Sequence, residues 1–549
     1  MVEWHVMDFR RIAAALALVP LLAGWQQQGE KPPVLHAATY LVQISVIVDD
    51  KSGHPVVDLT KDDFVISDRG KEQKIGFFSM DSSNGVSQPQ QVLPQNTFSD
   101  EPKYHGDPPN GVTIILLDNL NTLSSSAPLP YENTPYWLED HALAMAKRRL
   151  VEFLKQLDSK DKIAIYGLTD TVHVLCDFTC DRAQLLAVVN RYDATSKTRR
   201  EAVEPGDFHF PEPDNERLFD SQENSAVQRL AALNNHARAE ATMAALTAIA
   251  DHLADIPGRK NLLWLTANLP FSGQAIARIL GRANIAAYPV DARGLLPRGP
   301  MSSWNDVIDA DAYARGEIGR PPANAAIPIG IDTMQEMAEL TGGRAFVNTN
   351  DLTGAMRKVV EDSVVTYTLG FYVTPSSLDG KFHELKVQVQ RSGLNLRYPK
   401  GYFALKDAQA TQDERHNRFL AAIRNPLDSS AIPLQVKVDR VEQPGPHSLQ
   451  ILGSIGIKNL QFAQDGDVRN GTVDVYVIEQ DTAGNVLHQS TNRLRLKLTD
   501  KEYQTYLQSG IAFRQSVQLT QNGAMLRVLV QDSGTSEVGS VIIPLARVK

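Results

Sequence analysis

A short apolar run in the first third of the chain places the strongest limit on the fold. It reads GVTIILLDNLNT from Gly111 to Thr122, and its apolar part ends at Asp118. An unbroken apolar run with β-branched residues is typical of a strand buried on both faces, as in a parallel sheet covered by helices. Open α/β sheets bind their ligands at the carboxyl ends of such strands. We therefore expect Asp118 to lie at the edge of the sheet where a ligand would bind.

The pattern continues through residues 111–363 and predicts an α/β domain. Strands are expected at 163–168, 171–175, 261–266, 285–290 and 344–347, and helices at 137–157, 182–190, 226–254, 273–282, 333–341 and 352–362. This alternation favours a doubly wound, Rossmann-like parallel sheet with right-handed crossovers. Two polar segments, 193–222 and 295–330, are interpreted as insertions that flank the same crevice as Asp118.

Strand patterns lie on both sides of this domain. Residues 39–81 form a small β unit, and residues 364–405 contain three antiparallel strands. Neither closes a core alone, so we predict that they pair into one β-sandwich interrupted by the α/β domain. Residues 432–549 predict a second, immunoglobulin-like sandwich. Residues 82–110 are expected to be a linker that cannot order itself alone, because it has too little apolar surface to bury. Residues 406–431 are expected to be a polar helical linker.

The N-terminal segment, residues 1–38, predicts export. Arg10 and Arg11 precede an apolar run from Ile12 to Trp25 that is shorter than a bilayer span, as in a signal peptide or an N-terminal anchor. We expect a periplasmic, cell-envelope or secreted protein with no other transmembrane segment. The net charge of −9 and the lack of a basic patch argue against nucleic acid as a partner.

Cys176 and Cys180 are the only cysteines in the sequence. Four residues of strand separate two Cα atoms by about 13 Å, whereas a disulfide requires less than about 7 Å. A bridge would need a sharp turn at Asp177-Phe178-Thr179. The spacing therefore favours two unbridged cysteines near the end of a strand.

Several segments resemble the von Willebrand factor type A (VWA) domain, and together they resemble the acidobacterial-type VWFA-domain proteins over about residues 41–403. The matching stretches are PVVDLTKDDF, GVTIILLDNLNT, PGRKNLLWLT, AAYPVDARGL, MQEMAELTGGRAFVNTNDL and EDSVVTYTLGFY. In the wider fold, the resemblance implies a metal-ion-dependent adhesion site. That site has an Asp-x-Ser-x-Ser loop, a Thr and a second Asp, and its oxygens suit octahedral Mg²⁺.

The sequence departs from this site at two positions. Asp118 matches the first residue and Thr122 replaces the last Ser, but Leu120 stands at the middle hydroxyl position and Ala267 where the second Asp is expected. Asp118 and Thr122 are the remaining metal ligands, and Asn119, Asn121, Asn268 or an acidic residue of an insertion are the candidate substitutes. Alternatively, Asp118 caps the following helix or satisfies loop amides, a common role of Asp in such turns.

The motifs favour a binding role over catalysis. No G-x-S-x-G elbow, phosphate loop or G-x-G-x-x-G follows a strand. The histidines, including His173, His236 and His252, are isolated and expected to be structural. We expect a protein-binding or scaffold protein that uses Asp118, Asn119, Asn121, Thr122 and Asn268. The alternatives are a purely structural envelope protein and a hydrolase-type enzyme acting at the same edge.

Overall fold

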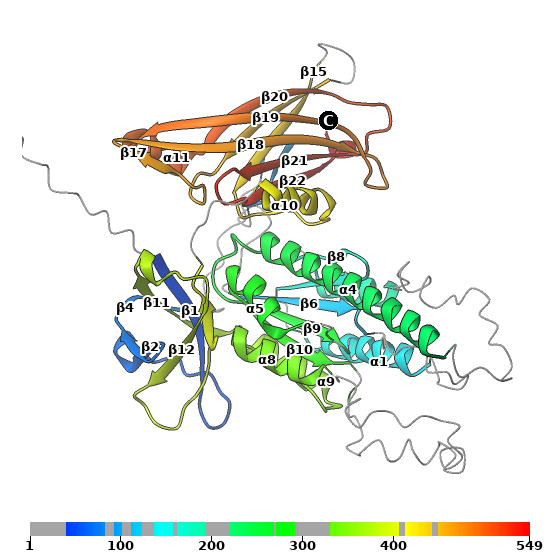
Figure 1. Ribbon diagram of the computed structural model, residues 1–549, viewed down its shortest axis with the longest axis vertical. Coiled ribbons are helices and arrows are strands. Elements are labelled where there is room, and N and C mark those ends of the chain that lie inside the picture. Colours follow the sequence, from blue (N-terminus) through cyan, green and yellow to red (C-terminus); the bar gives the residue numbers. More distant parts are fainter. Residues whose placement is uncertain are drawn as a thin grey trace, which may run out of the picture. The chain divides into compact units, whose positions relative to one another are not determined.

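The computed structural model describes most of the chain beyond residue 39 (Figure 1). The described residues are 40–82, 93–101, 111–122, 137–157, 162–178, 180–192, 220–267, 269, 271–292, 294, 330–405, 412–441 and 448–548. The predicted export segment and most of both predicted insertions lie outside these ranges. Within them, no helix combines the length and the apolar composition that crossing a membrane requires.

A mixed α/β unit holds the central sheet, whose strand order is β10-β9-β6-β7-β8. Four strands are parallel: β6 (Val112–Asp118), β7 (Ile163–Leu168), β9 (Lys260–Thr266) and β10 (Ile285–Asp291). The edge strand β8 (Val172–Cys176) runs antiparallel to β7. Every residue of the four parallel strands is buried, as the apolar runs predict for strands covered on both faces.

Helices cover both faces of this sheet. One face packs against α4 (Asp220–His252), α5 (Gly273–Arg282) and α8 (Ile331–Thr341). The other packs against α1 (Trp137–Leu154), α2 (Arg182–Arg191) and α9 (Leu352–Glu361). The strand predicted at 344–347 is reduced to a single bridge between Phe346 and Val290, so the sheet ends at β10.

Two four-stranded antiparallel sheets from both sides of the α/β unit enclose one core. Their orders are β13-β1-β11-β4 and β14-β12-β2-β3. The strands are β1 (Tyr40–Asp49), β2 (Phe64–Asp68), β3 (Lys71–Gln73), β4 (Ile75–Ser82), β11 (Val365–Val373), β12 (Phe382–Val389), β13 (Asn395–Arg397) and β14 (Gly401–Phe403), with short 3₁₀ turns η1 (Lys61–Asp63) and η3 (Pro375–Ser377). β1 pairs with β11 from Tyr40↔Val373 to Val46↔Tyr367. The α/β unit is thus inserted between strands of one β structure.

The C-terminal part also consists of two sheets around one core, with α10 (Gln412–Arg424) and α11 (Asp500–Ser509). One sheet has the order β20-β16-β15-β5, and the other β17-β18-β21-β22 with β19 paired to β18. The strands are β5 (Thr97–Ser99), β15 (Leu434–Val441), β16 (Ser448–Ile455), β17 (Ala463–Asp465), β18 (Val468–Gln480), β19 (Val486–Thr499), β20 (Ile511–Gln518), β21 (Met525–Asp532) and β22 (Val538–Pro544), followed by η4 (Leu545–Arg547).

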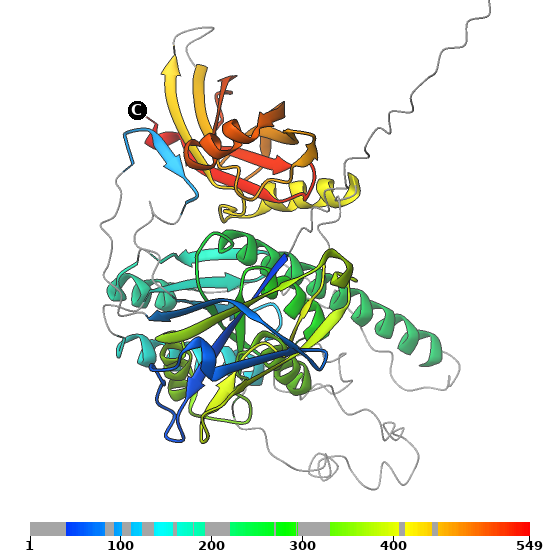
Figure 2. The ribbon, with the colours of Figure 1, turned by 90° about the vertical axis from the view of Figure 1, so that its left-hand side faces the viewer.

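Strand β5 corrects the prediction that residues 82–110 are only a linker. Its residues pair antiparallel with β15, from Thr97↔Lys437 to Ser99↔Gln435, and Phe98 packs against the C-terminal core. Figure 2 shows this light-blue strand beside the yellow β15. The segment lacks the apolar surface to order itself alone, but one aromatic side chain and a free sheet edge give it a partner far along the chain.

Helix α10 lies within the segment predicted to be a polar helical linker, residues 406–431. Its Phe419 ring packs against Tyr476 of β18, with ring centroids 4.3 Å apart. The guanidinium of the buried Arg527 on β21 donates hydrogen bonds to the carbonyls of Ala422 and Asn425 at the C-terminal end of the helix. α10 therefore covers the second sheet and is part of the C-terminal unit.

The cysteines are bridged, contrary to the sequence expectation. A disulfide joins Cys176 and Cys180, whose Cα atoms lie 6.0 Å apart. The extended-strand argument fails because β8 ends at Cys176 and the chain then turns, with the Cys180 amide donating to the Asp177 carbonyl at 3.1 Å. The turn brings the two cysteines within bridging distance.

Candidate functional site

The loop after β6 turns back over the end of β7. The amides of Asn119 and Leu120 both donate to the Leu168 carbonyl, at 2.9 and 3.2 Å. Leu120 then enters the core on the α4 side of the sheet, where only 4% of it is exposed. The apolar side chain that breaks the adhesion-site pattern thus anchors the loop to the core.

Asp118 is fully buried and accepts several hydrogen bonds. The amide of Asn121 donates to Oδ1 at 2.8 Å, and the Asn121 side-chain amide donates to Oδ2 at 2.9 Å. The indole N–H of Trp264 donates to Oδ2 at 2.8 Å. The Thr266 hydroxyl also hydrogen-bonds to this carboxylate. These donors occupy the roughly four lone-pair positions of a carboxylate.

The hydrogen bonds continue from Asp118 into helix α4. The Asn121 side-chain amide also donates to the Thr242 hydroxyl at 2.8 Å, and Thr242 donates to the Arg238 carbonyl at 2.8 Å. The Thr122 hydroxyl donates to the Asp118 carbonyl. Asn121 is fully buried, and Asn119 and Thr122 are each 4% exposed. These predicted binding residues lie inside the protein, where the contacts of Asp118, Asn121 and Thr122 hold the loop and join it to α4.

Burial controls the electrostatics of the site. It raises the pKa of Asp118 above its ordinary value, although the hydrogen bonds from Asn121, Trp264 and Thr266 favour the ionised form and oppose the shift. Burial and then the charge of Asp118 raise the pKa of Tyr192 at the end of α2. The Tyr192 hydroxyl lies over Gly167 of β7, where a Cβ would come within 2.2 Å of it, so only glycine leaves room for this phenol.

The residues present do not fit the Mg²⁺ site that the sequence resemblance implies. A metal would need open carboxylate oxygens, but those of Asp118 already accept N–H and O–H donors. Leu120 and Ala267 provide no side-chain oxygen, and Asn268 lies outside the described residues. Within the described part of the chain, no group of three or more His, Cys, Asp or Glu side chains is arranged to hold a metal ion.

Sequence reasoning missed the partners that define the site: Trp264, Thr242, Thr266 and Tyr192. Trp264 stands opposite Leu116 in the β6–β9 ladder, on the same face as Asp118, so its indole reaches the carboxylate along the sheet. An indole inside the apolar run LLWL of β9 was an available signal, because a buried Trp N–H needs an acceptor. The contact with Thr242 had no sequence signal, because it depends on where α4 crosses the sheet.

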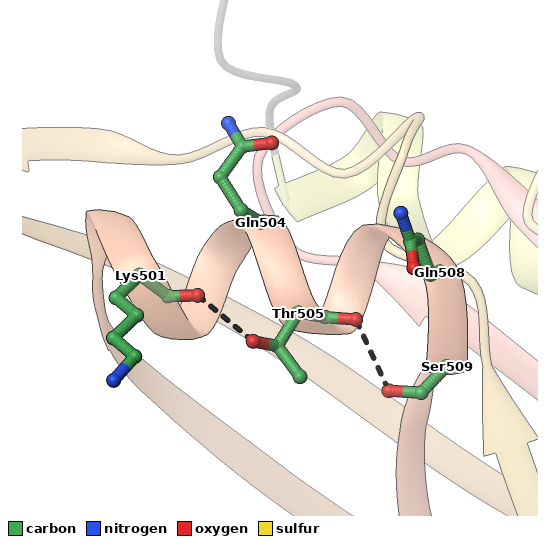
Figure 3. A pocket seen from close by; sticks show the side chains of 5 residues that line it. All are labelled: Lys501, Gln504, Thr505, Gln508 and Ser509. Atoms are coloured by element: carbon green, nitrogen blue, oxygen red, sulfur yellow. Dashed lines mark hydrogen bonds between the residues drawn. The ribbon is translucent and has the colours of Figure 1, made fainter.

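A hollow in the described surface lies far along the chain from Asp118, on helix α11. It is lined by Lys501, Gln504, Thr505, Gln508 and Ser509, which Figure 3 shows along one side of the helix. The Thr505 hydroxyl donates to the Lys501 carbonyl at 3.0 Å, and the Ser509 hydroxyl donates to the Thr505 carbonyl at 3.3 Å. These hydroxyls are engaged in hydrogen bonds within the helix.

The chain is similar to several solved structures at low identity. An aerotolerance-related membrane protein from Bacteroides fragilis shares 12% identity, with 46% of this chain and 98% of that chain covered and a TM-score of 0.24. A zinc-occupied form of proximal thread matrix protein 1 from the mussel byssus shares 11%, with 47% and 46% covered and a TM-score of 0.21.

A von Willebrand factor type A protein from Catenulispora acidiphila shares 11% identity with this chain. The similarity covers 77% of this chain and 73% of that one, with a TM-score of 0.19. No protein-family model and no curated protein matches the chain. We draw no functional conclusion from likenesses at these scores.

Proposed function

We propose that this chain is an exported, non-enzymatic binding or scaffold protein built around a VWA-type domain in which hydrogen bonds replace the metal. The filled oxygens of Asp118 are the observation that carries the proposal. The VWA assignment is supported by the matching sequence stretches and by a sheet with helices on both faces. We place the C-terminal two-sheet unit in the immunoglobulin-like class.

The partner-binding surface in this proposal is the carboxyl edge of the central sheet, not the side chain of Asp118. Both predicted insertions adjoin described residues at that edge. Tyr192, just before residues 193–222, lies over Gly167 near the end of β7. The backbone N–H of Gly294, just before residues 295–330, donates to the backbone carbonyl of Asp291 at the end of β10. A protein partner would contact this edge without displacing the buried hydrogen bonds.

Export is supported by two features. The N-terminal sequence has the charged start and short apolar run of a signal or an anchor. The Cys176–Cys180 bridge suits an oxidising compartment such as the periplasm or the cell exterior. We therefore propose that the chain works in the cell envelope or outside the cell.

Cross-linking capture from envelope and secreted fractions tests this function. We expect the wild-type chain to retain the same protein partners in EDTA and in Mg²⁺, because no metal takes part. Deleting residues 196–218 should remove them, and deleting residues 446–447 in the C-terminal unit should not. A partner bound only in Mg²⁺, partners unaffected by the deletion of residues 196–218, or substrate turnover by the purified chain would contradict the proposal.

A further inference from the structure

Strand β19 forms a long free edge of the C-terminal unit. It spans 14 residues and, among the strands that the structure describes, pairs only with β18, from Val486↔Gln480 to Thr499↔Val468. In an antiparallel ladder, about half of the N–H and C=O groups of an edge strand point away from its neighbour. Among the described residues, Val486–Leu498 form no backbone–backbone hydrogen bond outside this ladder. Within the part of the chain that the structure describes, β19 therefore offers a row of unused backbone donors and acceptors.

The first half of β19 is open on both faces. Residues 486–489 and 491–493 are all exposed, and Ser490 between them is half-buried and accepts a hydrogen bond from the Gln515 side chain of β20 at 2.7 Å. Successive side chains of a strand point to opposite faces, so among the described residues both faces of this stretch are uncovered except at Ser490.

The second half of β19 carries a cationic side chain at every second position. Arg493, Arg495 and Lys497 alternate with Leu494, Leu496 and Leu498, which contribute to the C-terminal core. The strand contains no acidic residue, although the whole chain has a net charge of −9. Arg493 forms an ion pair with Asp474, with nitrogen–oxygen distances of 2.6 and 2.9 Å. Arg495 and Lys497 are exposed and form no ion pair within the described part of the chain.

We propose that β19 binds an extended acidic segment of a partner protein by strand addition. The free backbone groups would supply main-chain hydrogen bonds, and alternate side chains would supply specificity. Side chains directly opposite each other on neighbouring strands lie about 4.5–5.5 Å apart. Acidic residues at every second position of the incoming strand would therefore stand beside Arg495 and Lys497.

The same cations disfavour a second copy of this chain as the occupant. Two β19 strands paired antiparallel about Arg493 or Arg495 would place like charges directly opposite each other, which is destabilising. Charges on an edge strand are also a known protection against pairing between identical edges. An acidic strand meets the opposite condition, since each cation gains a carboxylate partner.

The test is binding of a fluorescent peptide with alternating Glu and Val to the full chain, followed by anisotropy. We expect the wild type to bind it and the β19 amides to gain protection from hydrogen exchange. The double variant Arg495→Glu/Lys497→Glu should bind at least about tenfold more weakly, because charge reversal replaces attraction with repulsion. The matched control Lys381→Glu/Lys386→Glu, two exposed cations of the other β structure, should bind like the wild type.

A peptide N-methylated at the residues that face β19 separates strand addition from simple charge attraction. It keeps every carboxylate but cannot donate to the strand, so it should not bind. Equal binding of the methylated peptide, no binding of the parent peptide, or unchanged exchange of the β19 amides would overturn the proposal. So would a dimer in sedimentation whose β19 amides are protected without peptide. Matching thermal melts of all variants confirm that they fold.

Discussion

Asp118 stands where a ligand-binding carboxylate is expected, but its hydrogen bonds show a structural role in which it holds the loop after β6 in place. Its oxygens face an amide, an indole and a hydroxyl, and Leu120 fixes the loop in the core. Hydrogen-bond donors of this kind compensate a buried carboxylate in the way that a metal would. The charge of Asp118 is therefore used to close the loop over the end of the sheet.

Replacing Asp118 by Ala should destabilise the α/β unit by about 3 kcal/mol or more, because it leaves buried donors of Asn121 and Trp264 unpaired. Asp118→Asn should cost less, about 1–3 kcal/mol, because one oxygen still accepts while the new amide group faces the Asn121 N–H. Denaturant unfolding followed by Trp fluorescence measures both. Equal stability of the Ala variant and the wild type would mean that these bonds are not formed.

Leu120→Ser, which supplies the hydroxyl of the motif that the sequence resemblance implies, should also destabilise the protein, by about 2–4 kcal/mol. The change removes a buried apolar side chain and places a hydroxyl in the core. It should not create Mg²⁺ binding, because the oxygens of Asp118 stay occupied. Calorimetric titration of the variant with Mg²⁺ checks this, and a saturable heat absent from the wild type would contradict it.

At the level of helices and strands, most elements of the α/β unit could be predicted from the sequence. Apolar runs identified β6, β7, β9 and β10, because burial on both faces of a strand leaves an unbroken apolar run in the sequence. The helices were predicted in the segments that alternate with these runs. The short β5 and the Cys176–Cys180 turn left no such pattern, since each depends on contacts that only the folded chain provides. Likewise, Asp118 was predictable as a strand-end carboxylate, but its partners Thr242 and Tyr192 were not.

The disulfide loop should stabilise the edge of the sheet. Replacing both Cys176 and Cys180 by Ser should lower the free energy of unfolding by about 2 kcal/mol, the loop-closure entropy of a bridge over so few residues. Comparing chemical unfolding of the oxidised wild type and the variant measures this. Thiol labelling of the unfolded, unreduced protein gives an independent check: it should find no free cysteine, and two labelled thiols would show that the bridge is absent.

His252 at the end of α4 should make stability depend on pH. Its Nδ1 lies 2.7 Å from the Asp428 carbonyl and its Nε2 lies 3.6 Å from Asp177. Burial acts to lower the pKa of His252, but the hydrogen bonds and charges of Asp177 and Asp428 together outweigh it, and the pKa is raised. For Asp177, burial acts to raise the pKa, and the bonds from His252 and others lower it to about 2.

These shifts define a pH window for the His252–Asp177 pair. A raised His pKa contributes stability below about pH 6.5 that is lost as the pH rises through the folded pKa, and a lowered Asp pKa contributes stability above about pH 4 that is lost in acid. The stability difference between wild type and His252→Gln should therefore be largest near pH 5–6 and shrink above neutrality. Melting temperatures across this range measure it, and a difference independent of pH would contradict the account.

At the scale of the whole molecule, the structural units are not built from consecutive segments of the chain. It leaves the first β structure after β4, contributes β5 to the C-terminal unit, builds the α/β unit, and then returns to complete the first β structure with β11 to β14. The C-terminal unit is consequently incomplete without residues 93–101, although its other strands lie more than 300 positions later.

Phe98→Ala should therefore weaken the C-terminal unit rather than the first β structure that precedes it in sequence. Phe98 is half-buried against the C-terminal core, so the cost should be about 1–3 kcal/mol, below that of a fully buried Phe. Hydrogen exchange should show faster exchange in β15 and unchanged exchange in β1 and β11. The reverse pattern would mean that β5 does not belong to the C-terminal sheet.

The claim that Asp118 belongs to a hydrogen-bonded, metal-free site is tested most directly by crystals of the full chain soaked in Mn²⁺, with anomalous diffraction collected near the Mn edge. We predict no anomalous peak beside Asp118, with the Trp264 indole and the Asn121 amide still donating to its carboxylate. A peak at a coordination distance of about 2.0–2.2 Å from Asp118, with these donors turned away, would contradict the account.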